Sequence, residues 1–266
     1  MAQTTVLAIS ALLALVPASI LPFRTGPRRD TTFWILLAVA SVGPLVWLSA
    51  AFAPGWRTGL SGALIVTVAA TVLIYAGLAA STREAWRLSP LLLPYLILMG
   101  IIALIWQHQP ERPLADTAPS AWIVFHVAVS VVSYGLLSIG AVAGLAVFLQ
   151  ERALKSKRPG SLTRILPSVA DSEELQVRLL AASAVVLGIG IASGMTTQYF
   201  ETGAVLSFTH KIAFSILTFV VLTGLLLVHY RTGIRGRRAA RWVLLAWLLL
   251  TLAYPGVKFV TDILLA

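Results

Sequence analysis

The stretch that decides the fold is THKIAFSILTFVVLTGLLLVHYRTGIRGRRAARW, Thr209–Trp242. Its apolar part is long enough to cross a bilayer, because a helix of about 20 apolar residues spans the hydrocarbon core. A histidine stands at each end of that part, His210 and His229. The stretch closes on a cluster of arginines, and positive charge beside a span is typical of its cytoplasmic end. It therefore predicts a transmembrane helix with a defined direction.

Apolar runs of similar length recur along the rest of the chain. Of its 266 residues, 58% are apolar and 11% are charged, whereas soluble proteins carry about 45–50% and about 25%. The runs are continuous, which indicates helices rather than the alternating strands of a membrane barrel. No loop is long enough to build a soluble core. We therefore expect an all-α, polytopic integral membrane protein in which residues 1–266 form a single transmembrane domain.

These runs predict eight transmembrane helices. The first could also be read as a cleaved signal peptide, but MAQTT carries no positively charged side chain and only VPAS approaches a cleavage site, so we expect a retained helix. The fifth run is long enough to tilt or to protrude from the bilayer. The expected spans are 4–22, 32–52, 59–80, 88–106, 121–149, 177–195, 206–230 and 240–265.

The distribution of Lys and Arg predicts how the helices are oriented. The loops after the first, third, fifth and seventh spans hold 15 basic residues, whereas the remaining loops hold only Arg57 and Arg112. Arg178, near a span end, joins the larger group, while Lys211 and Lys258 join the smaller one, which gives 16 against 4. Positive charge concentrates on the cytoplasmic side, so both termini are expected outside, in the periplasm of a bacterial inner membrane.

Charge and motifs also limit the possible functions. The net charge of +10 comes mostly from the short loops, so we expect a lipid bilayer as the partner and no nucleic acid. The sequence contains no cysteine, which excludes a disulfide, a thiolate metal site and a covalent CxxCH haem attachment. It also lacks a Walker loop, a GxSxG elbow and an HExxH pair. We therefore do not expect an enzyme.

The four histidines are the best candidates for chemistry. In the predicted topology His108, His126 and His210 lie toward the outer side, and His229 lies at the inner end of the seventh span. His210 and His229 are 19 residues apart, which is about 28 Å along a helix, so they cannot bind the same ion. For a single histidine at the interface, a hydrogen bond to a neighbouring helix is the more common role. The pair His126 and His210 is the stronger candidate, because both lie at a similar depth.

Two neutral imidazoles facing each other across a helix bundle can ligate a haem iron. Trp122 lies one turn before His126, and Tyr134 lies two turns after it, so both aromatic rings could pack on a porphyrin. An interfacial aromatic belt with ordinary helix packing explains the same rings equally well. Arg112 and Lys211 lie on the same side and could meet haem propionates. The cofactor suggested by these residues is a non-covalent, b-type haem, with His126 and His210 as its iron ligands.

Two regions carry a resemblance to a known family. In the C-terminal part, an apolar span is followed by HYRTGIRGRRAARW and then by LLTLAYPGV in the last span. Earlier, WIVFHVAVSVVSYGLLSIGAVAGLAVFLQE forms a histidine-containing span followed by a basic loop. Residues 120–264 thereby resemble the core of the cytochrome c assembly family, which includes CcsA-, CcmC- and HemX-like membrane proteins. The matching positions are His126, Ser133, Tyr134, His229, Arg235, Gly236, Arg237, Arg238, Ala239, Ala240, Trp242, Tyr254, Gly256 and Val257.

The sequence also departs from that family. Arg241 interrupts the basic stretch, Pro255 interrupts the last patch, and the loop TTQYFETGAVLSFTHK lacks the tryptophan-rich WWD motif of haem-delivering members. The chain therefore looks most like the HemX- and YpjD-like inner-membrane branch. The resemblance implies that His126 matches an outer haem ligand and His229 a histidine within the membrane.

The resemblance implies a haem-binding or haem-handling protein that assists cytochrome c biogenesis or haem homeostasis, with haem and cytochrome assembly proteins as partners. Two alternatives without haem stay open. One is a membrane transporter or a subunit of one, and the other is a scaffold for another membrane protein.

Overall fold

The structure is a computed structural model that describes residues 2–109, 120–203, 210–234 and 236–261. This part of the chain is helical and contains no strand. Eight of its helices are long and apolar enough to cross a membrane, which confirms the predicted fold class. The main helices of these spans are α1 (Ala2–Thr25), α2 (Thr31–Phe52), α3 (Leu60–Ser81), α4 (Ser89–Ile105), α5 (Ser120–Ser156), α7 (Val169–Thr202), α8 (His210–Thr232) and α9 (Gly236–Thr251). The described residues also form four shorter elements: η1 (Ala85–Leu88), α6 (Ser161–Ile165), η2 (Leu252–Gly256) and α10 (Val257–Phe259). The element η1 completes the span of α4, and η2 and α10 complete the span of α9.

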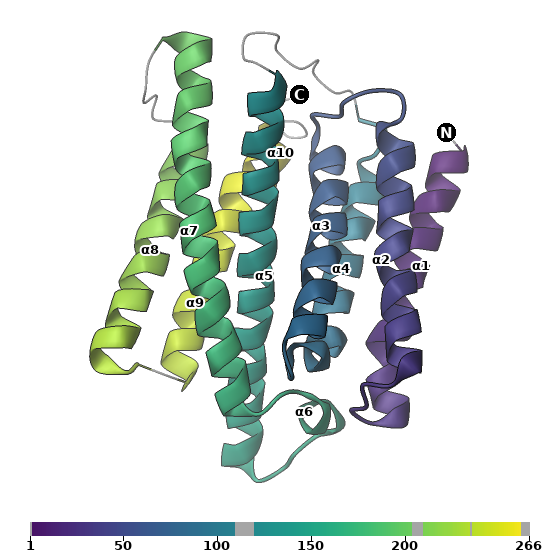
Figure 1. Ribbon diagram of the computed structural model, residues 1–266, viewed down its shortest axis with the longest axis vertical. Helices are drawn as coiled ribbons and strands as arrows, with labels where there is room; N and C mark the ends of the chain where they lie inside the picture. Colours follow the sequence, from purple (N-terminus) through teal and green to yellow (C-terminus); the bar gives the residue numbers. More distant parts are fainter. Residues whose placement is uncertain (1, 110–119, 204–209, 235, 262–266) are drawn as a thin grey trace.

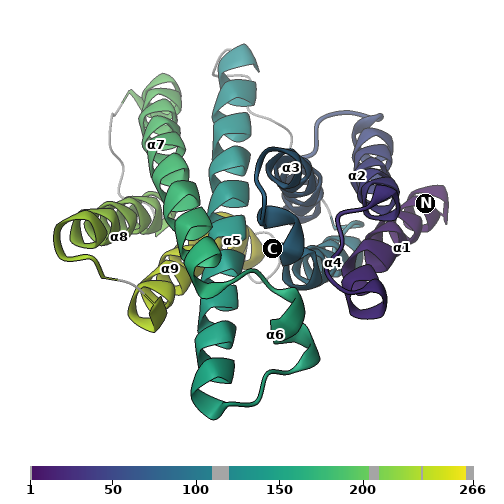
Figure 2. The ribbon, with the colours of Figure 1, turned by 60° about the horizontal axis from the view of Figure 1, so that its bottom comes forward.

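The helix α5 lies at the centre of the bundle. Helices α1 to α4 form one group, in which α1 packs against both α2 and α4 (Figure 1). Helices α7, α8 and α9 form the second group on the opposite side of α5 (Figure 2). The helix α5 packs along α7 and α9 and also contacts α3. It therefore joins the two groups, and residues on its two faces are buried against different partners.

The helices α5 and α7 are longer than the spans that hydropathy predicts. The helix α5 has 37 residues, so its length is about 55 Å, against about 30 Å for the hydrocarbon core. The expected spans were 121–149 and 177–195, but α5 continues to Ser156 and α7 begins at Val169. Ser168 caps the start of α7 by accepting a hydrogen bond from the backbone N–H of Asp171 at 3.2 Å. Polar residues continue both helices beyond the apolar spans, and α6 lies in the connection between them, beside their lower ends in Figure 1.

The last transmembrane helix changes its winding near its C-terminal end. After α9, the segment η2 is a π-helix that contains Pro255, and α10 follows it directly. Proline has no backbone N–H and cannot take part in regular α-helical bonding, and π-helical turns occur frequently at functional sites. The wider turn places Ala253 and Tyr254 on the wall of the cavity described below.

The beginning of α1 and the end of α10 lie at the same end of the bundle (Figure 1). An even number of spans requires this arrangement. Which side of the membrane that end faces stays a prediction from the charge distribution, and the end that holds both termini is named the outer end after that prediction.

Candidate functional site

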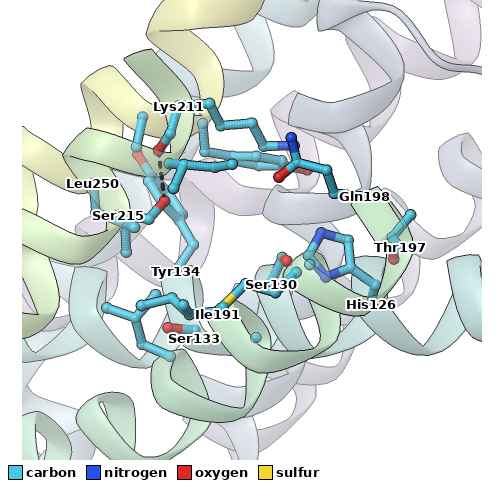
Figure 3. A pocket seen from close by; sticks show the side chains of 17 residues that line it. His126, Ser130, Ser133, Tyr134, Ile191, Thr197, Gln198, Lys211, Ser215 and Leu250 are labelled. Carbon is cyan, nitrogen blue, oxygen red and sulfur yellow. Dashed lines mark hydrogen bonds between the residues drawn. The ribbon is translucent and has the colours of Figure 1, made fainter. Parts of the chain in front are cut away.

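A cavity of about 420 Å³ opens between α5, α7, α8 and η2 (Figure 3). Its volume falls in the range of small-molecule sites, about 300–1,000 Å³. Apolar side chains line much of it, together with polar groups that converge from three helices and η2. These polar residues are His126, Ser130, Ser133, Tyr134, Thr197, Gln198, Lys211, Ser215 and Tyr254.

His126 is held in place by one turn of α7. Its Nδ1 lies 2.9 Å from the Oγ of Ser193, which is buried. The Cε1 edge of the ring faces Gly194, where a Cβ atom would lie only 3.0 Å away. Trp122 belongs to the same contact, because its indole N–H donates to the carbonyl of Ser193 at 3.2 Å. Figure 3 shows the other edge of the imidazole facing the part of the cavity where Gln198 lies.

Tyr134 is part of a hydroxyl network that joins α4, α5 and α9. Its hydroxyl lies 3.1 Å from that of Tyr95 and 3.0 Å from the Oγ1 of Thr251. The Tyr95 hydroxyl also lies 3.4 Å from the Oγ of Ser138, which accepts a hydrogen bond from the indole N–H of Trp247 at 3.1 Å. The ring centroids of Tyr134 and Tyr254 are 5.8 Å apart. The inner wall of the cavity is therefore aromatic and held by hydrogen bonds from several helices.

Lys211 brings a positive charge to the outer part of the cavity. It is the second residue of α8 and lines the cavity on the same side as Gln198 (Figure 3). One turn further along, the hydroxyl of Ser215 donates to the backbone carbonyl of Lys211 at 2.9 Å. A ligand with an apolar body and an anionic substituent would match this arrangement, because the ammonium is a strong partner for a carboxylate.

The structure brings together only some of the residues proposed from the sequence. His126, Tyr134 and Lys211 line one cavity. His210 is exposed at the start of α8 and is not part of the cavity wall, and the Trp122 indole is bonded to α7 rather than lining the cavity. Arg112 lies outside the described residues. Roles for His210, Trp122 and Arg112 in cofactor binding stay predictions.

His229 forms a separate site near the inner end of α8, as its spacing from His210 predicts. Its Nδ1 lies 2.9 Å from the carbonyl oxygen of Ile234 and must donate, because a carbonyl only accepts. Gly233 ends the helix at φ +67°, and its N–H donates to the carbonyl of His229 at 2.9 Å. The imidazole therefore bridges the turn between α8 and α9.

The basic stretch after His229 attaches α9 to the centre of the bundle. The backbone N–H of Gly236 donates to Glu173 of α7 at 2.5 Å. Arg237 lies over the ring of Phe148 at 4.7 Å, with its Nε 3.9 Å from Glu151 of α5. Gly236 has φ +66°, and a Cβ atom there would collide with the Glu151 carboxylate. This part of the motif therefore fixes the position of α9 against α5 and α7.

His108 lies at the outer end of the other group of helices. It lines a second cavity of about 380 Å³ with Trp56 and Arg57. The guanidinium of Arg57 donates to the carbonyl of Gln107 at 2.8 Å. This cavity is separate from the one around His126.

Three residues that line the cavity were not identified as site residues from the sequence: Gly194, Met195 and Tyr254. Ser193, which contacts His126 but does not line the cavity, was not identified either. Ser193 affects the cavity only through its hydrogen bond to His126. The sequence feature that could have pointed to them is the spacing of Gly190 and Gly194, because small residues four apart on a helix indicate close approach of a neighbouring helix.

In the parts of the chain that the structure describes, no three His, Cys, Asp or Glu residues form a metal site. A lone imidazole in a cavity is consistent with binding a prosthetic group.

The fold and the cavity define a polytopic membrane protein with a histidine-bearing cavity in its C-terminal half. The family model described as cytochrome C assembly protein matches residues 33–265. The chain therefore belongs to the cytochrome c assembly protein family, and the resemblance found in the sequence is confirmed.

Three relatives illustrate the range of similarity. An uncharacterized 28.8 kDa protein of Azospirillum brasilense is 54% identical over 270 residues, with 100% of both chains covered. The inner membrane protein YpjD of Escherichia coli K12 is 24% identical over 269 residues, which cover 99% of this chain and 98% of that one. The cytochrome c biogenesis protein CcsA of Parasynechococcus marenigrum is 27% identical over 183 residues, or 61% and 60% of the two chains. With its eight apolar helices, the protein is a multi-pass protein of the bacterial inner membrane.

Proposed function

We propose that the protein binds haem non-covalently in the cavity between α5, α7, α8 and η2, and that it handles haem for cytochrome c assembly or haem homeostasis. The observation that carries this proposal is the imidazole of His126, oriented by Ser193 at 2.9 Å and exposed to a cavity within the membrane. The relative described as a cytochrome c biogenesis protein supports the biological context.

The cavity residues fit such a ligand. His126 would ligate the iron, Tyr134 and Tyr254 would pack against the porphyrin, and Lys211 would meet a propionate. When bound, haem supplies an iron centre that either stays with the protein or is passed on. The chain's own residues orient the ligand, and the buried aromatic wall keeps water away from it.

We further propose a role in binding and transfer rather than catalysis, because the sequence contains no hydrolase or nucleotide-hydrolysing motif. The partners would be proteins of cytochrome assembly that supply haem to this cavity or accept it.

The proposal is tested by an absorption spectrum and a pyridine haemochrome assay on protein purified in detergent. We expect a Soret band in the native protein and its loss in His126→Ala. Because His210 lies outside the cavity wall, His210→Ala should lose less haem than His126→Ala. His229→Ala should leave the haem of this cavity in place. A native protein that is colourless and takes up no added haem would contradict the proposal.

A further inference from the structure

The hydroxyl of Ser193 has two hydrogen-bond partners, of which the Gly190 carbonyl can only accept while the His126 imidazole can donate or accept. It donates to the backbone carbonyl of Gly190 at 2.9 Å, and its oxygen lies 2.9 Å from the Nδ1 of His126. A serine hydroxyl has one proton, and a carbonyl oxygen can only accept. With that proton on the Gly190 contact, the contact with His126 requires Nδ1 to be the donor.

We infer that Ser193 is a positioning residue that holds His126 in the tautomer with the proton on Nδ1, so that the lone pair on Nε2 faces the cavity. A neutral imidazole carries one N–H, so protonation of Nδ1 leaves Nε2 as an acceptor or metal ligand. This inference deepens the proposed haem site and rests on it for the role of Nε2.

The surroundings of the ring favour the same orientation. Gly194 leaves room for the Cε1 edge, where a Cβ atom would lie 3.0 Å away. Trp122 ties the same turn of α7 to α5 through the Ser193 carbonyl at 3.2 Å. Ser193 itself is 3% exposed, so water does not compete freely for its hydroxyl. In the imidazole of His126, Nδ1 is therefore hydrogen-bonded to Ser193, Cε1 packs against Gly194, and Nε2 faces the cavity.

A hydrogen bond from the second nitrogen of a ligating histidine affects the metal as well as the ring. It fixes the tautomer and raises the basicity of the ligating nitrogen, and its loss typically lowers metal affinity about 10–100-fold. Ser193→Ala should therefore weaken haem binding by about this factor. It should also raise the midpoint potential of bound haem, because a less basic imidazole stabilises ferric iron less.

The first measurement needs no haem. The full-length protein is labelled with ¹⁵N-histidine, and the signals of its four histidines are assigned with His126→Ala as the reference. We expect His126 to carry its proton on Nδ1 in the native protein, to lose this preference in Ser193→Ala and to keep it in Ser193→Thr, which retains the hydroxyl. A proton on Nε2 in the native protein, or an unchanged tautomer in Ser193→Ala, would overturn the inference.

The second measurement uses protein loaded with haem. Haem titration and redox potentiometry are compared for the native protein, Ser193→Ala, Ser193→Thr and the control Ser41→Ala. The control removes a buried hydroxyl that donates to a backbone carbonyl on α2, away from the cavity. We expect weaker binding and a higher potential only in Ser193→Ala. Equal effects in Ser41→Ala and Ser193→Ala would contradict the positioning role. If the native apoprotein shows the Nδ1 proton but binds no haem, the proposed function fails while the tautomer assignment stands.

Discussion

A glycine on α7 determines how closely the histidine of α5 can approach. A Cβ atom at Gly194 would lie 3.0 Å from the Cε1 of His126, which is closer than ordinary van der Waals contact. We expect Gly194→Ala to keep the helix, because alanine favours helix more than glycine does. It should displace the imidazole and lower haem affinity, by about 10-fold if the contact with Ser193 is lost as well. Haem titration of the purified variant measures this effect.

The matched control for this substitution is Gly224→Ala on α8, where a Cβ atom would meet nothing within 4 Å. It makes the same chemical change in a transmembrane helix without touching the cavity. Equal haem affinity in Gly194→Ala and the native protein would show that the close approach at Gly194 does not position His126.

At the residue scale, the sequence could identify His126 but not what holds it. A histidine within an apolar run stands out because ionisable groups in membrane spans are rare. Ser193 and Gly194 do not stand out, because small residues are common in transmembrane helices and only the packing of α5 on α7 gives these two their roles. Similar depth in the membrane suggested His210 as a partner for His126. Depth does not determine which way a side chain points, and His210 lies outside the cavity wall.

At the scale of helices, the hydroxyl network around Tyr134 joins elements from both halves of the bundle. Tyr134→Phe removes a hydroxyl that lies 3.1 Å from Tyr95 on α4 and 3.0 Å from Thr251 on α9. Tyr95 keeps its contact with Ser138 and Thr251 keeps its hydrogen bond to the Trp247 carbonyl at 2.8 Å, so the loss is that of ordinary hydrogen bonds, about 0.5–1.5 kcal/mol each. We expect a lower apparent melting temperature in detergent, measured by tryptophan fluorescence.

The partner variant shows whether the network acts as a unit. Tyr95→Phe removes the other hydroxyl of the same pair, so the double variant should lose less stability than the sum of the two single variants. Additive losses would mean that the two tyrosines stabilise the bundle independently. Ser81→Ala, which changes an exposed hydroxyl at the end of α3, serves as the control and should leave the melting temperature unchanged.

Hydropathy predicts the existence of the helices better than their ends. All eight spans were predicted because each needs enough apolar residues to cross the bilayer, which is a constraint on composition. The inner ends of α5 and α7 were not predicted, because outside the lipid a helix no longer needs apolar residues. There, local signals such as the Ser168 cap of α7 decide where the helix starts. The π-helical turn of η2 depends on packing around Pro255, and the sequence showed only that a proline was present.

At the scale of the whole molecule, the candidate site lies within the second half of the chain. The cavity is lined by α5, α7, α8, α9 and η2, and the resemblance found in the sequence covers nearly the same residues, 120–264. Helices α1 to α4 contribute Tyr95, which supports the cavity wall from behind through Tyr134. The first half therefore supports one face of α5, while the face that packs on α7 and α9 contributes the site.

The orientation of the molecule can be tested directly because the native chain contains no cysteine. Gln109 is exposed at the outer end predicted for α4, and Ser156 is exposed at the opposite, basic end of α5. With 16 of the 20 basic residues on one side, that side should be cytoplasmic. A membrane-impermeant maleimide should therefore label Gln109→Cys in intact spheroplasts and label Ser156→Cys only after lysis. The native protein should stay unlabelled throughout. Labelling of Ser156→Cys before lysis would place both termini in the cytoplasm and would move the cavity around His126 to the cytoplasmic half of the membrane.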